Sequence, residues 1–138
     1  MEENRIRKAF QNDRLARFLG IEILEIKPGY ARTALRVNQN MLNSLAMTHG
    51  SAIFALADMA FAVACNSHGT AAVALSVNIN FMKATGEGSL LTATAEEECR
   101  TSRTGVYRIT IENEKGEKIA SAVGTAYRTG RPLPGCNL

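Results

Sequence analysis

One helical run constrains this fold more than any other segment, because it is apolar on nearly every side. From Ala52 to Cys65 all 14 residues except Asp58 are apolar, and six of them are alanine. A surface helix carries its apolar residues in one stripe, so this pattern predicts a helix that is covered all round. We expect it to run from Gly50 to about Ser67, with alanines that let neighbouring strands approach closely.

The other segments predict one helical region and six strands. Residues 2–19 place apolar side chains at mostly helical spacing and predict a broken amphipathic helix, with Asp13 as a cap and Gly20 as a stop. Two strands are expected at 21–27 and 31–37 around a Pro-Gly turn. After the long helix the period changes to two, and Val73, Leu75, Val77, Ile79 and Phe81 are predicted to share one face of a strand. Three further strands are expected within 89–102, 105–116 and 117–130, joined by short hairpins.

The expected fold class is α+β, with a long central helix wrapped by a six-stranded antiparallel sheet and preceded by an N-terminal helix. The length of 138 residues fits one domain covering 1–138, with a helical segment at 1–20 and an irregular tail at 131–138. One helix and one sheet leave strand edges and a sheet face uncovered. A two-fold homodimer is the expected completion.

Composition and motifs exclude several classes of function. The net charge of +3 is spread along the chain without a basic block, which argues against nucleic acid, and the charged N-terminus lacks the apolar core of a signal peptide. The apolar run is too short to span a bilayer, so we expect a cytoplasmic protein without a membrane partner. Three widely spaced cysteines predict free, buried thiols and no metal site. Serine hydrolase, nucleotide-triphosphatase and dinucleotide motifs are absent from the sequence.

Asp58 is the strongest candidate for chemistry. A buried carboxylate must find hydrogen-bond donors, become protonated or face a cleft, because an isolated buried charge is very costly. Its helical neighbours offer no donor, and perturbed carboxylates gather at functional sites. The alternative is a purely structural role for Asp58, as a polar contact that holds the helix to a loop.

Gly50 is a candidate for the opposite reason, since it begins the helix. Its backbone N–H lies at the positive end of the helix dipole, and a glycine lets a substrate carbonyl approach closely. Asp58 follows eight residues later, which places it about 12 Å further along the same helix. One carbonyl cannot contact both, so we expect the two residues to act together from different subunits.

Several other polar residues are candidates with weaker support. His49 could be a general base or could fix the loop, and Asn43 could orient a water or a carbonyl or simply form a turn. Ser76 and Asn78 are polar on one face of the strand after the helix. The basic residues that could hold an anionic ligand such as a phosphorylated cofactor are Lys83, Arg103, Arg128 and Arg131.

The chain resembles the phenylacetate-pathway (PaaI-type) branch of the hotdog-fold acyl-CoA thioesterases over roughly residues 15–130. The resemblance is carried by "MLN", "HGSAIFALADMAFAVACNSHG", "FMKATGEGSLLTATA", "TGVYRITIENEKGEKIA" and "GTAY". It implies coenzyme A thioesters as substrates, no separate cofactor, and dimers that commonly pair into homotetramers. By position, Gly50 is similar to the residue that polarises the thioester carbonyl, Asp58 to the catalytic carboxylate of the partner subunit, and Asn43 and His49 to supporting loop positions.

Two positions depart from the family pattern. Ser51 stands where many members have a second glycine; because serine is also small, we expect the helix start to be retained, and Ser51 is a candidate substrate-binding residue. Ala74, Leu75 and Ser76 occupy the strand positions from which some relatives position a water molecule. We expect hydrolysis of an aryl- or medium-chain acyl-CoA to the free acid and coenzyme A. The alternatives are a non-catalytic acyl-CoA binding or sensing module, which would not need Asp58, and a hotdog dehydratase, which the position of His49 fits poorly.

Overall fold

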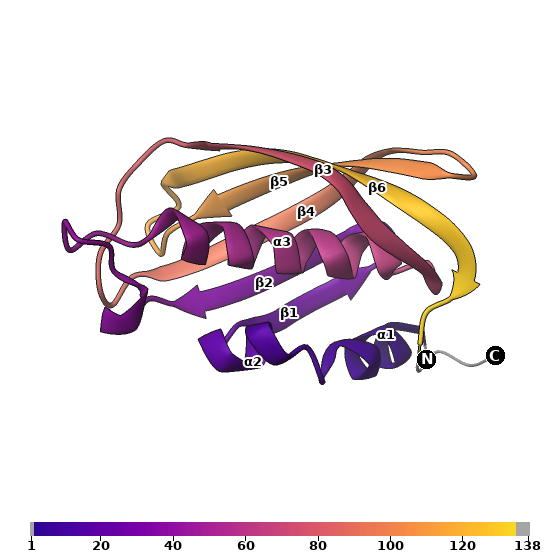
Figure 1. The fold of residues 1–138 in the computed structure, drawn as a ribbon, viewed down its shortest axis with the longest axis horizontal. Coiled ribbons are helices and arrows are strands. Elements are labelled where there is room, and N and C mark those ends of the chain that lie inside the picture. Colours follow the sequence, from indigo (N-terminus) through magenta and orange to yellow (C-terminus); the bar gives the residue numbers. More distant parts are fainter. Residues whose placement is uncertain (1, 135–138) are drawn as a thin grey trace.

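The computed structural model describes residues 2–134 and contains three α-helices, one short 3-10 helix and six strands (Figure 1). The helices are α1 (Glu2–Phe10), α2 (Arg14–Leu19) and α3 (Gly50–Asn66), and the 3-10 turn is η1 (Gln39–Met41). The strands are β1 (Glu22–Lys27), β2 (Tyr30–Arg36), β3 (Thr70–Phe81), β4 (Leu90–Arg100), β5 (Thr104–Glu112) and β6 (Lys118–Pro132).

The six strands form one antiparallel sheet in the order β1-β2-β4-β5-β6-β3, and α3 lies against one face of it (Figure 1). The core consists of the sheet-facing side of α3 and the inner face of the strands, with Leu56, Ala60, Phe61 and Ala64 buried from the helix side. The expected architecture of a central helix wrapped by six strands is confirmed. The small helix side chains permit the tight packing of sheet on helix.

The N-terminal region consists of two helices where the sequence predicts one broken helix. Asp13 caps α2 by accepting a hydrogen bond from Ala16 N–H at 2.9 Å, and Gly20 ends α2 in the left-handed conformation at φ 80°. The predictions of Asp13 as a helix cap and Gly20 as a helix stop are therefore confirmed. Arg7 of α1 donates to the Ile23 carbonyl at 2.7 Å, so α1 lies along the otherwise open edge of β1.

The prediction that the apolar residues of β3 share one face is wrong for the first half of the strand, because β3 contains a bulge. The pairing with β6 shifts register between Ala74 and Ser76, and directly paired residues of antiparallel strands share a face. Val77 pairs with Gly124, whose added Cβ would contact Phe61 of α3, so Val77 faces inward. Val73 instead shares the outer face with Ser76 and Asn78. The apolar row is consequently not buried along its length: Val73 is 55% exposed, Leu75 60% and Phe81 52%.

A side chain added at Gly124 is expected to lower stability strongly, because β6 passes directly over an aromatic ring of α3. A Cβ added at Gly124 would lie 2.8 Å from Cζ of Phe61, a side chain that is buried and cannot swing out. We expect Gly124→Ala to lower the free energy of unfolding by about 1–3 kcal/mol, the usual cost of overpacking a core. Gly86→Ala is the matched control, because nothing lies within 4 Å of its added Cβ. Urea denaturation of both variants measures the difference, and equal stabilities would contradict the packing described.

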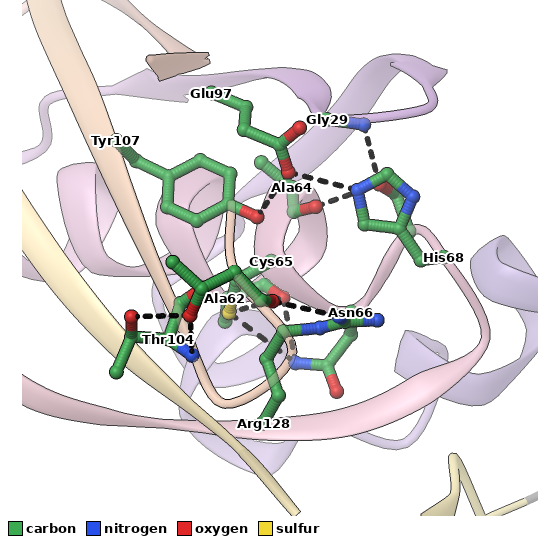
Figure 2. A network of polar contacts seen from close by, with 12 residues as sticks. Gly29, Ala62, Ala64, Cys65, Asn66, His68, Glu97, Thr104, Tyr107 and Arg128 are labelled. Carbon is green, nitrogen blue, oxygen red and sulfur yellow. Dashed lines mark hydrogen bonds and ion pairs between the residues drawn. The ribbon is translucent and has the colours of Figure 1, made fainter. Parts of the chain in front are cut away.

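The C-terminal end of α3 is tied to the sheet by a polar network that the sequence does not reveal (Figure 2). Glu97 of β4 accepts hydrogen bonds from Tyr107 at 2.7 Å and lies 2.8 Å from Nε2 of His68. Burial raises the pKa of Glu97, but the hydrogen bonds from Tyr107 and His68 outweigh it and leave this pKa below its usual value. The sequence suggests that His68 helps to cap the helix with Gly69. Gly69 is left-handed at φ 84° and its N–H donates to the Asn66 carbonyl, and the side chain of His68 in addition joins this turn after α3 to β4.

Three further predictions, on the C-terminal tail, the cysteines and membrane-spanning helices, can be compared with the structure. β6 continues to Pro132, so the first residues of the expected irregular tail belong to a strand, and residues 135–138 lie outside the described part. Cys65 is buried, whereas Cys99 is exposed, and Cys136 lies outside the described residues. No helix described for residues 2–134 is long and apolar enough to cross a membrane.

Candidate active site

The first turn of α3 forms one half of the candidate site. His49 is the N-cap residue, with extended backbone, and its Nδ1 accepts a hydrogen bond from the Ser51 N–H at 3.0 Å. The Ala52 N–H donates to the His49 carbonyl. Within residues 2–134 the Gly50 N–H has no hydrogen-bond acceptor. It is therefore a free donor at the positive end of a 17-residue helix.

The loop before α3 is held together by Asn43. Its Oδ1 accepts hydrogen bonds from the backbone N–H groups of Leu45 at 2.9 Å and Met47 at 3.1 Å. These bonds support a tight turn in which Ala46 has a positive φ of 61°. The carbonyl group of Asn43 is thus used structurally, which leaves its side-chain NH₂ as the group that can face a substrate.

His49 can be tested as a capping residue. We expect His49→Ala to lower the free energy of unfolding by about 1 kcal/mol, because the Ser51 N–H loses its acceptor. His49→Asn should recover most of that loss, since Asn is a preferred N-cap residue. Thermal denaturation and thioester turnover of both variants are the measurements. Equal loss of turnover in both variants, with the Asn variant fully stable, would instead give the imidazole a chemical role.

Asp58 lies on the side of α3 that faces α2, away from the sheet. Residues spaced three and four apart share a helix face, and Ala55, Asp58, Met59 and Ala62 together line one wall of a cavity of about 160 Å³. No hydrogen bond or ion pair joins the Asp58 carboxylate to another residue of the described chain. Burial raises the pKa of Asp58 above its usual value, and the neighbouring carboxylate of Asp13 raises it further.

A second cavity lies next to the first and extends it toward the helix start. It has a volume of about 390 Å³ and is lined mainly by apolar side chains from α2, η1 and α3, with His49 and Ser51 at one end. Leu15 and Ala55 line both cavities. The side of α3 that the sheet leaves open therefore carries a largely apolar groove between α2 and α3, with Asp58 in one part and the first turn in the other.

The distance between Gly50 and Asp58 is as the sequence predicts. Both belong to one uninterrupted helix, so their eight-residue offset separates them by about 12 Å along its axis. Within one chain they cannot contact the same carbonyl group. Phe81, at the end of β3, lies over the helix start: a Cβ added at Gly50 would be 3.3 Å from Cζ of Phe81. Sequence reasoning missed this contact, because nothing in the pattern pairs the strand end with the helix start.

The remaining candidates fall in three different places. Lys83 follows β3 near the start of α3 and forms an ion pair with Glu117. Ser51 lines the larger cavity through its position in the first turn. Ser76 and Asn78 project from the outer face of the sheet, because they pair with Thr125 and Val123, on the face opposite α3. In one chain, these two side chains are separated from the groove by the sheet itself.

The three arginines lie at the other end of α3. Arg128 pairs with Ala72 in the sheet and donates to the Thr101 carbonyl at 3.1 Å. Arg103 donates to the Tyr127 hydroxyl at 3.3 Å, and Arg131 lines a surface depression with His68. They are therefore far from the Gly50 end of their own chain. Within residues 2–134, no three His, Cys, Asp or Glu side chains come together as metal ligands.

Comparison with known proteins shows the family of this chain. The profile of the thioesterase superfamily matches residues 45–120, more than half of the chain, including Gly50 and Asp58. The acyl-coenzyme A thioesterase PaaI of Escherichia coli is 40% identical over 126 residues, which cover 91% of this chain and 90% of that protein.

Solved structures of thioesterases are also similar to this chain. The structure of E. coli PaaI, from the phenylacetic acid degradation operon, matches with a TM-score of 0.91 at 39% identity and covers 94% of both chains. The structure of a hypothetical thioesterase protein of Streptococcus pneumoniae with coenzyme A matches with a TM-score of 0.78 at 28% identity, over 81% of this chain and 90% of that one. On the evidence of sequence, helix and sheet together, the chain belongs to the thioesterase superfamily and has its hotdog fold.

Proposed function

We propose that this protein hydrolyses an acyl-CoA thioester to the free acid and coenzyme A, with Gly50 and Asp58 as the central residues. The observation that carries the proposal is the Asp58 carboxylate, which has no hydrogen-bond or ion-pair partner among residues 2–134. It faces a largely apolar groove on the same helix whose first N–H is a free donor within that range. Such a pair supplies the two parts that acyl transfer requires: a donor for the developing oxyanion and a group that attacks or activates water.

The substrate class is supported by the relatives. E. coli PaaI is named an acyl-coenzyme A thioesterase, and the S. pneumoniae structure contains coenzyme A. The apolar lining of the larger cavity suits an aryl or medium-chain acyl group. The reaction needs no further cofactor, since coenzyme A is part of the substrate.

Gly50 would act on the thioester carbonyl. Its N–H donates to the carbonyl oxygen, which becomes negative as the tetrahedral intermediate forms, and the helix dipole stabilises the same charge. The absence of a side chain at Gly50 lets Phe81 lie close over the helix start, so a substrate carbonyl would reach the Gly50 N–H by displacing this half-exposed ring. Asn43 would order the preceding loop and offer its NH₂ to the substrate.

Asp58 would act on the carbonyl carbon, either directly or through water. As a general base it takes a proton from water, the hydroxide adds to the carbonyl carbon, and the C–S bond then breaks to release coenzyme A thiolate, which takes up a proton. As a nucleophile it forms an acyl anhydride with loss of the thiolate, and water then hydrolyses that anhydride. The raised pKa of Asp58 suits either role, because a desolvated carboxylate is a stronger base.

The active unit would be a homodimer, in which the Asp58 of one subunit faces the Gly50 of the other. This part of the proposal is supported by the separation of about 12 Å along α3, which is too long for both residues of one chain to contact the same carbonyl group. The open edge of β3, with its half-exposed Val73, Leu75 and Phe81, offers an apolar strand for edge-to-edge pairing about a two-fold axis. Pairing of two dimers into a tetramer is part of the proposal, through the resemblance to PaaI-type enzymes.

The same dimer would bring basic residues to the substrate. Lys83 lies near the Gly50 end of its own chain, whereas Arg103, Arg128 and Arg131 lie at the opposite end of α3. The arginines could therefore approach the coenzyme A phosphates only from another subunit. Ser51 would line the acyl-binding groove, while Ser76 and Asn78, on the outer face, would contact a substrate only if it were held by a neighbouring subunit.

A panel of acyl-CoA thioesters tests the proposal. Release of the free thiol is followed for aryl-, hydroxyaryl- and medium-chain acyl-CoA, and hydration of an enoyl-CoA is followed in parallel. We expect thiol release with at least one member of the panel and no hydration. Tight binding of acyl-CoA without turnover would point to a sensing module, and hydration without thiol release would point to a dehydratase; either result would overturn the proposal.

A further inference from the structure

We propose that Asp13, the N-cap residue of the short helix α2, is a positioning residue for Asp58 that sets the pH range in which the site works. This inference rests on the proposed function, because it assigns a role to Asp13 only through the Asp58 carboxylate. Asp13, which caps α2, and Asp58 of α3 are 45 positions apart in the chain, yet both line the same cavity of about 160 Å³.

The carboxylate of Asp13 is held in place by the structure of α2. Its Oδ1 accepts from the Ala16 N–H at 2.9 Å, and its backbone carbonyl accepts from the Arg17 N–H at 3.1 Å. At the other end of α2, the Ile21 N–H donates to the Ala16 carbonyl at 2.8 Å and fixes the turn into β1. Ala16 and Ile21 line the cavity as well. The contact of its Oδ1 with the Ala16 N–H therefore holds the Asp13 side chain in the lining of the cavity that Asp58 also lines.

The other ionisable groups near Asp58 do not line its cavity. Arg14 and Arg17 of α2 line a depression with Phe18, and Arg17 and Arg7 line another whose wall includes Ala16, Ile21 and Met59 of the Asp58 cavity. Arg7 donates to the Ile23 carbonyl, and among the described residues none of these arginines forms an ion pair with Asp58. Cys65, two turns further along α3, is buried, and burial together with Asp58 raises the pKa of its thiol to about 12, so it stays neutral. Asp13 is the only other charged residue in the lining of the described cavity.

Two like charges across an apolar cavity favour protonation of the more buried one. Asp58 would thus bind its proton more tightly than burial alone requires, and activity that needs the ionised form would fall as the pH decreases through this raised pKa. Without the charge of Asp13, Asp58 would stay ionised to lower pH. The charge of Asp13 would therefore lower activity at low pH. At neutral pH it would make the Asp58 carboxylate more basic, which favours proton abstraction from water.

The variant Asp13→Asn tests this proposal, because Asn is as good an N-cap as Asp and only the charge is removed. We expect the acid limb of the kcat/KM profile for thioester hydrolysis to move to lower pH. Glu112→Gln is the matched control: it removes one negative charge from an exposed position at the end of β5, and its acid limb should coincide with that of the wild type. Carboxyl ¹³C NMR of Asp58 should show the same displacement directly.

The outcomes separate this proposal from the function on which it rests. An unchanged rate in Asp58→Asn would remove the proposed function. Loss of activity in Asp58→Asn, combined with identical acid limbs and identical Asp58 titrations in Asp13→Asn and Glu112→Gln, would remove the role of Asp13 alone. A displaced Asp58 titration in Asp13→Asn, without one in the control, supports the proposal by a measurement that does not depend on turnover.

Discussion

Replacing Asp58 by Asn is expected to reduce kcat for acyl-CoA hydrolysis by a factor of about 10²–10⁴, the usual contribution of a positioned acid–base group. The amide keeps the size and shape of the carboxylate but cannot take a proton or attack the thioester. Because the larger cavity and the Gly50 N–H are unchanged, we expect substrate binding to persist while turnover is lost. Steady-state kinetics of thiol release measure kcat and KM separately.

The stability of the Asp58→Asn variant provides the control. The carboxylate makes no hydrogen bond with the described residues, and its pKa is raised in the folded state by burial and by Asp13. A raised carboxyl pKa means that folding stability is highest below the unfolded pKa and is lost as the pH rises through the folded value. The Asn variant should therefore be at least as stable as the wild type at neutral pH. Wild-type turnover in this folded variant would remove Asp58 from the mechanism.

Replacing Gly50 by Val is expected to reduce turnover by about 10²–10³, comparable to the loss of one oxyanion donor. The backbone N–H remains, but the added side chain occupies the approach to it and presses on Phe81, whose ring would lie 3.3 Å from the new Cβ. Phe81 is half exposed and can move, so we expect the fold to persist.

Gly50→Ala provides the graded comparison, with a smaller loss than the Val variant. Both are measured by thiol release, alongside circular dichroism to monitor the helix. Full activity of the folded Val variant would show that no substrate group approaches the Gly50 N–H.

Much of the fold could be predicted because its local signals are strong. The apolar run fixed the bounds of α3 to within a residue, and Asp13 and Gly20 marked the ends of α2. The bulge in β3 could not be predicted from the sequence. The apolar residues keep a period of two through the strand, whereas the extra residue of the bulge moves the side chains before it to the opposite face of the sheet. The contact of His68 with Glu97 was equally hidden, since it joins residues 29 positions apart whose proximity only the packed sheet creates.

The candidate site was predictable where it depends on one helix and not where it depends on several. The placement of Gly50 at the start of α3 and the partly buried position of Asp58 follow from helical geometry. The sequence left two alternatives for His49, and the structure shows the N-cap contact of the first, while a chemical role stays a prediction. The shared cavity of Asp13 and Asp58, and the position of the arginines at the far end of α3, depend on tertiary packing that spacing does not encode.

The central claim is that each active site takes Asp58 from one subunit and Gly50 from its partner, and a mixed dimer tests it directly. Asp58→Asn and Gly50→Val chains with different affinity tags are co-expressed, and the heterodimer is purified through both tags. In a shared site, one of the two sites in this dimer carries both substitutions and the other carries neither. We predict that the heterodimer recovers about half of the wild-type turnover per dimer, although each parent is nearly inactive. A heterodimer as inactive as its parents would place both residues of each site in one chain and contradict the account.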